Sequence, residues 1–249
     1  MSLFDYIILI LFPVAGGLAA FQLRKIKAEH LNLLLSFSGA YLFGITILEM
    51  MPAVFHDTNR TLGIFVIAGF LLQILLDQFS KGIEHGHMHV HESVGKSYVW
   101  SVMIGLGLHS FLEGIPLTGL EHSHAHGSHL HDEHGSSPLL WGIAIHKVPA
   151  AFALMSILLT ARISTVSAFA ILVVFALISP AAAAITDLVL HSGSVITDSM
   201  SYILALVVGS FLHISTTILF EVNSKIHRFS LYKMLVILVG LIVALVTVV

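Results

Sequence analysis

The chain has 249 residues, of which 57% are hydrophobic and only 10% are charged. Soluble domains carry about 25% charged residues, so this composition excludes a soluble protein and predicts an all-α polytopic membrane protein. The formal net charge of −3 gives no sign of a nucleic-acid partner, and the absence of cysteine excludes disulfides, thiolate ligands and cysteine nucleophiles.

Eight apolar segments follow one another along the chain, each long enough to cross a bilayer as a helix. The first lacks a basic start and a cleavage site, so we expect it to be retained rather than removed as a signal peptide. All eight belong to one expected transmembrane domain, residues 1–249. The expected helices cover residues 3–23, 31–53, 62–79, 99–120, 139–160, 166–190, 200–220 and 231–249.

The loops between these segments predict the orientation of the protein in the membrane. Lys and Arg accumulate on the cytoplasmic side of short connections. Nine of the eleven basic residues belong to the loops after the first, third, fifth and seventh segments, whereas the opposite loops hold only Arg60. We therefore expect both termini to lie outside the cytoplasm, in a plasma or inner membrane.

The fourth segment carries two ionisable residues near its middle. The stretch from Gly105 to Gly119 reads GLGLHSFLEGIPLTG, and His109 and Glu113 are four residues apart, which places them on one face of a helix above Gly105. A charged group at a helix centre costs on the order of 2.5 to 3.5 kcal/mol in hydrocarbon, so such residues persist mostly where function needs them. Imidazole and carboxylate are both ligands for zinc-like ions, so this pair is half of a metal site; the alternative is a buried polar pair bonded to a neighbouring helix.

The fifth segment supplies the other half. His146 lies between Gly142 and Ala150 on one helix face, and small residues let transmembrane backbones approach closely. We expect the two helices to oppose each other, so that His109, Glu113 and His146 meet at one point and leave a position open for water or another ligand.

Prolines follow two of the proposed ligands, Pro116 after Glu113 and Pro149 after His146. Proline removes a helical hydrogen bond, and broken helices at membrane depth are typical of ion sites in transporters. We expect a break at each proline; the alternative is an ordinary kink that shapes packing.

Lys147 follows His146 directly and points about 100° away from it around the helix. A buried ammonium needs a partner, so we expect Lys147 to face the same polar channel and to offset the charge of Glu113 as a fixed cation. The alternative is a structural ion pair elsewhere, for example with Asp77 or Asp187.

Two loops are rich in histidine, and together they hold ten of the seventeen histidines. Alternating histidines with acidic neighbours and Gly or Ser indicate flexible metal-binding tracts, which would collect ions loosely; the alternative is a hydrophilic linker. Residues 84–92 form the expected cytoplasmic tract, and residues 121–134 form the expected external tract. The candidate collectors are His85, His87, His89 and His91 in the first tract and His122, His124, His126, His129, His131 and His134 in the second.

Short motifs in four segments resemble those of the ZIP family of divalent-metal transporters. HSFLEG in the fourth segment and HKVPAA in the fifth are similar to family patterns close to HNFPEG and HNIPEG, and SFSGAYLFGITILEMMP and GFLLQILLDQF resemble the family's second and third helices. The resemblance implies a ZIP-like bundle of eight transmembrane helices, both termini outside, a His-rich cytoplasmic loop after helix three, and a central metal site on helices four and five.

The chain departs from the family pattern at several places. Lys147 and Ala150 stand where members that bind two metals have bridging residues, and Ser179-Pro180 stands where a Glu-Pro pair is often found. The resemblance therefore implies one core metal, with the lysine ammonium near the vacated second position. Ser110 replaces an Asn and is a weaker candidate ligand. The implied metal ligands are His109, Glu113 and His146.

We therefore expect transport of Zn²⁺, or of a similar cation such as Fe²⁺, Mn²⁺ or Cd²⁺, toward the cytoplasm, with no organic cofactor and no enzymatic activity. An intramembrane zinc hydrolase is an alternative, although no segment contains HExxH. A retinal protein is a further alternative, prompted by the single intramembrane lysine. The sequence leaves open the driving force, the choice between a channel and alternating access, the role of the external tract, and whether the protein is a homodimer.

Overall fold

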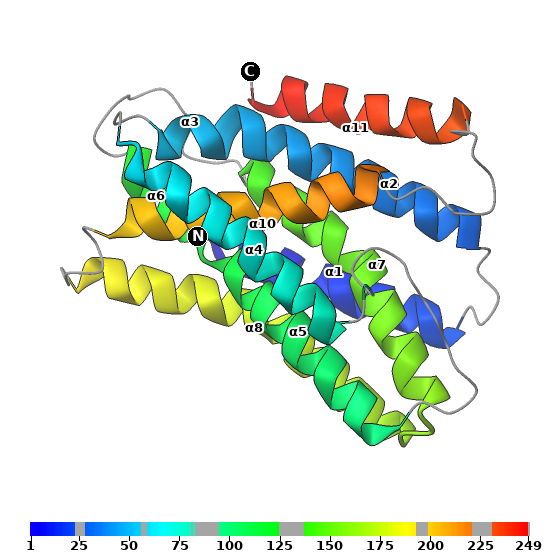
Figure 1. The fold of residues 1–249 in the computed structure, drawn as a ribbon. Coiled ribbons are helices and arrows are strands. Elements are labelled where there is room, and N and C mark those ends of the chain that lie inside the picture. The colour runs from blue at the N-terminus through cyan, green and yellow to red at the C-terminus, as the bar shows by residue number, and fades with distance from the viewer. Residues whose placement is uncertain are drawn as a thin grey trace.

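A computed structural model describes residues 1–22, 28–55, 59–80, 82, 95–124, 137–192, 199–220 and 231–248. Within these ranges the regular structure is entirely helical, as expected (Figure 1). The helices are α1 (Leu3–Gln22), α2 (Ala28–Ile45), η1 (Thr46–Met50), α3 (Met51–Val54), α4 (Thr61–Ser80), α5 (Lys96–Gly114), α6 (Pro116–His124), α7 (Pro138–Thr160), α8 (Thr165–His191), α10 (Met200–Phe220) and α11 (Leu231–Val248).

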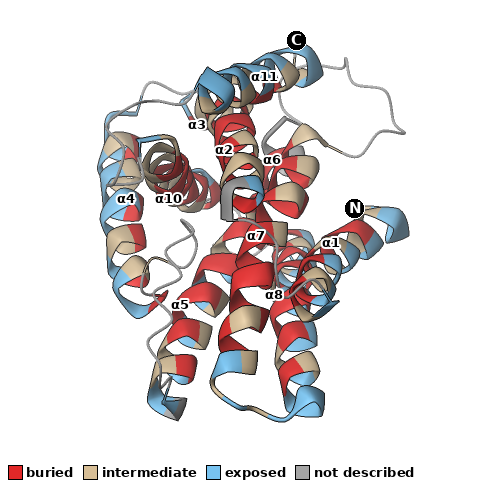
Figure 2. Cartoon of the chain, turned by 90° about the vertical axis from the view of Figure 1, so that its right-hand side faces the viewer, coloured by how far each residue is buried: buried red, intermediate tan, exposed pale blue. Residues whose placement is uncertain are grey.

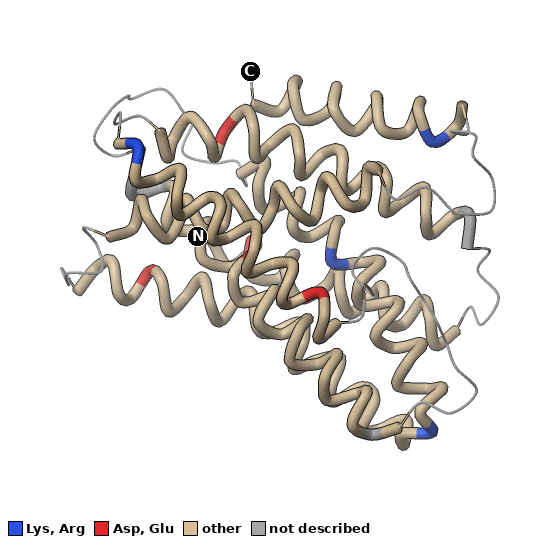
Figure 3. Tube along the Cα trace, in the orientation of Figure 1, with Lys and Arg blue, Asp and Glu red and all other residues tan. Residues whose placement is uncertain are grey.

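Eight stretches of the described chain are long and apolar enough to cross a membrane. Six of them are single helices; α2, η1 and α3 together form the second, and α5 with α6 forms the fourth. Positions of charged residues are sparse along all of them (Figure 3). Because the spans alternate in direction, the start of α1 and the end of α11 lie toward the same end of the bundle, on the left in Figure 1.

The two prolines behave differently. α5 ends at Gly114 and α6 begins at Pro116, so the expected break is present there. Proline fits the first position of a helix, where its missing N–H has no helical partner to lose. α7, by contrast, continues through Pro149, so the expected break at this residue is wrong. The loss of one backbone hydrogen bond at Pro149 does not interrupt α7, which is long and largely buried.

The helices pack in two groups. The first group comprises α1, α5, α7 and α8, and its closest pairs are α1 with α7, α5 with α8 and α1 with α8. The second group comprises α2, α4, α10 and α11, and its closest pairs are α4 with α10, α2 with α11 and α2 with α10. The main contacts between the groups join α4 to α5 and α2 to α7. α7 is the most enclosed span, with 78% of its apolar window buried, whereas only 11% is buried in α11 (Figure 2). α7 therefore forms the centre of the bundle, and α11 presents its apolar side chains outward.

Two large apolar clusters make up most of the buried interior, and a small third one joins Leu35, Ile214 and Ile218. The shared core draws residues from both helix groups, such as Leu42, Ile143 and Phe211, whereas the second core lies mainly among α1, α5, α7 and α8. Along α7, buried side chains up to Ala144 belong to the shared core and those from Ala150 onward to the second core. The polar residues between these two positions therefore lie at mid-depth, where the two cores meet.

Candidate metal centre

His109 and Glu113 lie on one face of α5, close to its end. Their spacing of four residues brings His109 Nε2 to 3.1 Å from Glu113 Oε1. Both side chains are almost fully enclosed, with 3% and 1% of their surfaces exposed. Glu113 is therefore held within the last turn of α5, directly before the break at Ile115.

His146 reaches the same carboxylate from α7. Its Nε2 atom lies 3.9 Å from Glu113 Oε1, and its ring is perpendicular to that of His109 with 6.1 Å between the ring centroids. One ligand atom from each of the three residues lies within 4.8 Å of the other two. Ligands of a tetrahedral zinc ion, each at about 2.0 to 2.1 Å from the metal, are separated by roughly 3.3 Å. Small side-chain movements would therefore let the three residues share one ion and leave a coordination position open.

The backbones of α5 and α7 do not meet at their small residues, so the expected close approach is wrong. Gly105 faces α4, where an added Cβ would lie 2.6 Å from the backbone nitrogen of Ser80. Gly142 faces α2, with the ring of Tyr41 at 3.3 Å from such a Cβ. The three ligand side chains need room between the helices they come from, so the small residues serve contacts with the neighbours on either side.

Neighbouring helices hold the two ligand-bearing helices in place. Gly114 of α5 packs against the carbonyl oxygen of Ser179 on α8, and the Ser179 hydroxyl donates a hydrogen bond of 2.5 Å to the carbonyl of Ser110. Gly16 of α1 packs in the same way against the carbonyl of Val148 on α7. A side chain at either glycine would overlap the facing backbone, so these contacts require glycine and set the position of the ligands.

Lys147 lies beside the cluster and is enclosed to the same degree. Its Nζ atom is 3.9 Å from Glu113 Oε2 and 4.9 Å from the centroid of the Phe175 ring, a distance typical of cation–π contacts. The alternative partners Asp77 and Asp187 each lie beside a histidine instead. Sequence reasoning did not identify Phe175, because nothing distinguishes one aromatic residue in an apolar helix from another.

Two further residues hold a buried polar atom without a hydrogen bond among the described residues. The hydroxyl of Ser110 is fully enclosed and makes no hydrogen bond with the described residues. The Oε2 atom of Glu49 is likewise buried without a hydrogen bond, in the π-helical segment η1. Glu49 was visible in the sequence as an acid within an apolar segment, but sequence reasoning assigned it no role.

The histidine tracts lie almost entirely outside the described residues. In the tract 84–92 none of the four histidines is described, and in the tract 121–134 only the backbone of His122 and His124 is, as the last turn of α6. The candidate collectors that lie wholly outside the described residues are His85, His87, His89, His91, His126, His129, His131 and His134.

Comparison with known proteins connects this cluster to a family. The profile of the ZIP zinc transporter family matches residues 84–247, which include every residue of the cluster. A zinc transporter from Xenopus tropicalis, ZIP9, is 28% identical over 191 residues, covering 72% of this chain and 59% of that protein. The chain thus spans less than two thirds of the length of this relative.

Proposed function

Because the chain belongs to the ZIP zinc transporter family, we propose that it carries Zn²⁺ or a similar divalent cation across a membrane through a site for one ion. The ligands in this proposal are His109, Glu113 and His146. The observation that supports it is the convergence of three buried ligand atoms, from two helices, within 4.8 Å of one another.

Lys147 acts in this proposal as a fixed cation. Its ammonium lies 3.9 Å from Glu113 Oε2, whereas both imidazoles lie against the other carboxylate oxygen, Oε1. A second divalent ion at this distance from an ammonium would meet strong repulsion in a medium of low dielectric. The lysine therefore keeps the site mononuclear and balances Glu113 when no ion is bound. Ser110 is a weaker candidate for an additional oxygen ligand.

The loop charges give the orientation of the protein, and transport toward the cytoplasm is what the resemblance to the ZIP family implies. With both termini outside, the tract 84–92 lies in the cytoplasm and the tract 121–134 lies outside, so each would collect ions at one mouth of the protein. Transport then runs toward the cytoplasm, in a plasma or inner membrane. Neutral imidazoles with one carboxylate also accept Fe²⁺, Mn²⁺ and Cd²⁺, so these ions are candidate substrates.

Uptake of radioactive zinc into proteoliposomes tests the ligand assignment. His109→Ala and His146→Ala should each abolish uptake, because each removes one of three protein ligands. His191→Ala is the matched control, since this histidine is 65% exposed at the end of α8 and should leave uptake unchanged. Normal uptake by the first two variants would show that the ion passes elsewhere.

Members of this family are transporters, so an enzymatic role is not favoured. A hydrolase would also need a general base poised beside a metal-bound water. In the described structure the carboxylate of the cluster, Glu113, instead lies between two imidazoles and an ammonium. We therefore assign no catalytic residue.

A further inference from the structure

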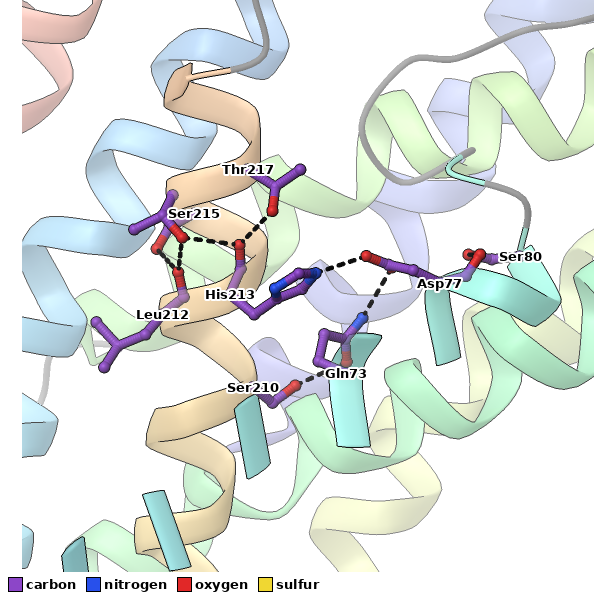
Figure 4. A network of polar contacts seen from close by, with 9 residues as sticks. Gln73, Asp77, Ser80, Ser210, Leu212, His213, Ser215 and Thr217 are labelled. Atoms are coloured by element: carbon purple, nitrogen blue, oxygen red, sulfur yellow. Dashed lines mark hydrogen bonds and ion pairs between the residues drawn. The ribbon is translucent and has the colours of Figure 1, made fainter. Parts of the chain in front are cut away.

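A second group of ligand-type side chains, none of them shared with the core cluster, lies between α4 and α10 (Figure 4). Asp77 and His213 are its ionisable members, and Gln73 and Ser210 lie one turn earlier on the same two helices. Asp77 and Gln73 were visible as polar residues in an apolar segment. His213 was missed, because its partner is 136 residues away in the chain.

The four side chains form one connected series. His213 Nε2 lies 2.7 Å from Asp77 Oδ2, and the amide nitrogen of Gln73 donates to the other carboxylate oxygen at 3.4 Å. The hydroxyl of Ser210 donates to the amide oxygen of Gln73 at 2.8 Å. Gln73 thus orients the carboxylate of Asp77, and Ser210 in turn orients the amide of Gln73. Carboxylates that bind metals are usually held by hydrogen bonds in this way.

Two glycines, one on each helix, hold α4 and α10 close together at a point that precedes Asp77 and His213 in the chain. An added Cβ at Gly69 would lie 1.8 Å from the carbonyl oxygen of Leu206, and one at Gly209 would lie 1.9 Å from that of Val66. Backbones in such close contact cannot rotate or slide without separating. Asp77 and His213, one to two turns beyond this contact, are therefore presented in a fixed register.

The pair is more open than the core cluster. The side chains of Asp77 and His213 are 14% and 13% exposed, against 1% to 3% for the core ligands. Asp77 is three residues from the end of α4 at Ser80, and the histidine tract 84–92 follows in the chain. The protein therefore does not seal the pair completely, and ligands from outside the protein could complete a coordination shell that these two side chains supply only in part.

We propose that Asp77 and His213 form a second binding site for a divalent cation, with one carboxylate oxygen and one imidazole nitrogen as protein ligands and water in the remaining positions. A zinc or cadmium ion would replace the direct hydrogen bond, and the two atoms would separate from 2.7 Å to roughly 3.3 Å. A shell with only two protein ligands holds an ion loosely. The site therefore suits brief residence near the end of α4. That role rests on the proposed function, but the existence of the site does not.

The contacts among these four side chains could instead serve only to hold α4 against α10. Two substitutions distinguish this structural role from metal binding. Asp77→Asn keeps an oxygen that accepts from His213 and keeps the shape of the side chain, but it removes the charge that a metal needs. Ser210→Ala breaks the series at its far end and leaves both proposed ligands. A purely structural role predicts similar, mild effects of both changes; a metal site predicts that only the first abolishes binding.

Equilibrium dialysis of the purified full-length chain against radioactive cadmium tests the proposal. All variants carry asparagine in place of the ten tract histidines, so that the tracts do not contribute. With the core ligands intact we expect two bound ions per chain, and with His109→Ala and His146→Ala we expect one weaker ion. Adding Asp77→Asn to these two changes should remove that ion, as should His213→Gln, and adding Ser210→Ala should retain it.

The outcomes distinguish this inference from the proposed function. If no ion remains after removal of the core ligands, or if the remaining ion survives Asp77→Asn, the second site does not exist and the core assignment stands. If His109→Ala and His146→Ala remove no ion, the core assignment fails instead. Loss of the second ion in Ser210→Ala but not in Asp77→Asn would contradict the assignment of Asp77 as a ligand.

Discussion

The core cluster and the α4–α10 pair both place an imidazole against a carboxylate inside apolar helices, yet they differ in what surrounds the carboxylate. Glu113 meets two imidazoles and one ammonium at distances from 3.1 to 3.9 Å. Asp77 meets one imidazole at 2.7 Å and a neutral amide. The first arrangement collects cationic and metal-binding groups around one acid, whereas the second is a hydrogen-bonded series along one interface.

The two sites also differ in how closely the backbones of their helices approach each other. α4 and α10 touch at Gly69 and Gly209, so their polar side chains bridge a narrow interface. α5 and α7 stay apart, and their closest backbone neighbours are α8 and α1. Where ligand side chains lie between two helices that stay apart, an ion can be admitted among them. Changes in the two regions should therefore have different consequences for stability and for transport.

The largest expected effect is that of Glu113→Gln, which removes a ligand and leaves the buried ammonium of Lys147 without its carboxylate. Breaking one side of a buried ion pair costs about 3 to 5 kcal/mol. We expect a marked fall in melting temperature together with loss of zinc uptake.

The double variant Glu113→Gln with Lys147→Met separates the two causes. Replacing both charges by neutral groups of similar size is often nearly neutral for stability. Thermal melting should recover, whereas uptake should stay absent because the ligand is still missing. Recovery of uptake as well would show that Glu113 contributes charge balance and not a metal ligand.

A smaller expected effect follows from Gly209→Ala at the α4–α10 contact. The new methyl group would lie 1.9 Å from the carbonyl oxygen of Val66, so the helices must separate. Overpacking of this kind costs about 1 to 3 kcal/mol. Gly63→Ala in α4 is the control, since no atom lies within 4 Å of its added Cβ. Equal melting temperatures for the two variants would contradict the close contact.

The smallest expected effect is that of Ser179→Ala, which deletes the hydrogen bond from α8 to the carbonyl of Ser110. The carbonyl lies within α5, so its loss of one donor should cost about 0.5 to 1.5 kcal/mol. Melting should shift slightly, and uptake should fall modestly because α5 carries two of the proposed ligands. A complete loss of uptake would indicate that Ser179 does more than position this helix.

Local spacing was enough to predict much of the fold and the grouping of His109 with Glu113. Apolar length marked the spans, and a separation of four residues placed this pair on one face. The partner of a helix face could not be predicted in this way. Gly105 does lie against the backbone of another helix, but sequence periodicity does not show that this helix is α4, or that Gly142 faces the ring of Tyr41 on α2.

Contacts between distant helices were also beyond sequence reasoning. His213 carries no local sign of its contact with Asp77, because the pairing depends on the register of α4 against α10. The different behaviour of Pro116 and Pro149 depends in the same way on surroundings: the first begins α6, and the second lies within the most enclosed helix.

The most direct test of the central claim is anomalous scattering from zinc-soaked crystals of the full-length chain. We expect a single core ion bound by His109, Glu113 and His146, each at about 2.0 to 2.2 Å from the metal, with the ammonium of Lys147 beside it. Two adjacent core ions, or one ion bound without these three residues, would contradict it.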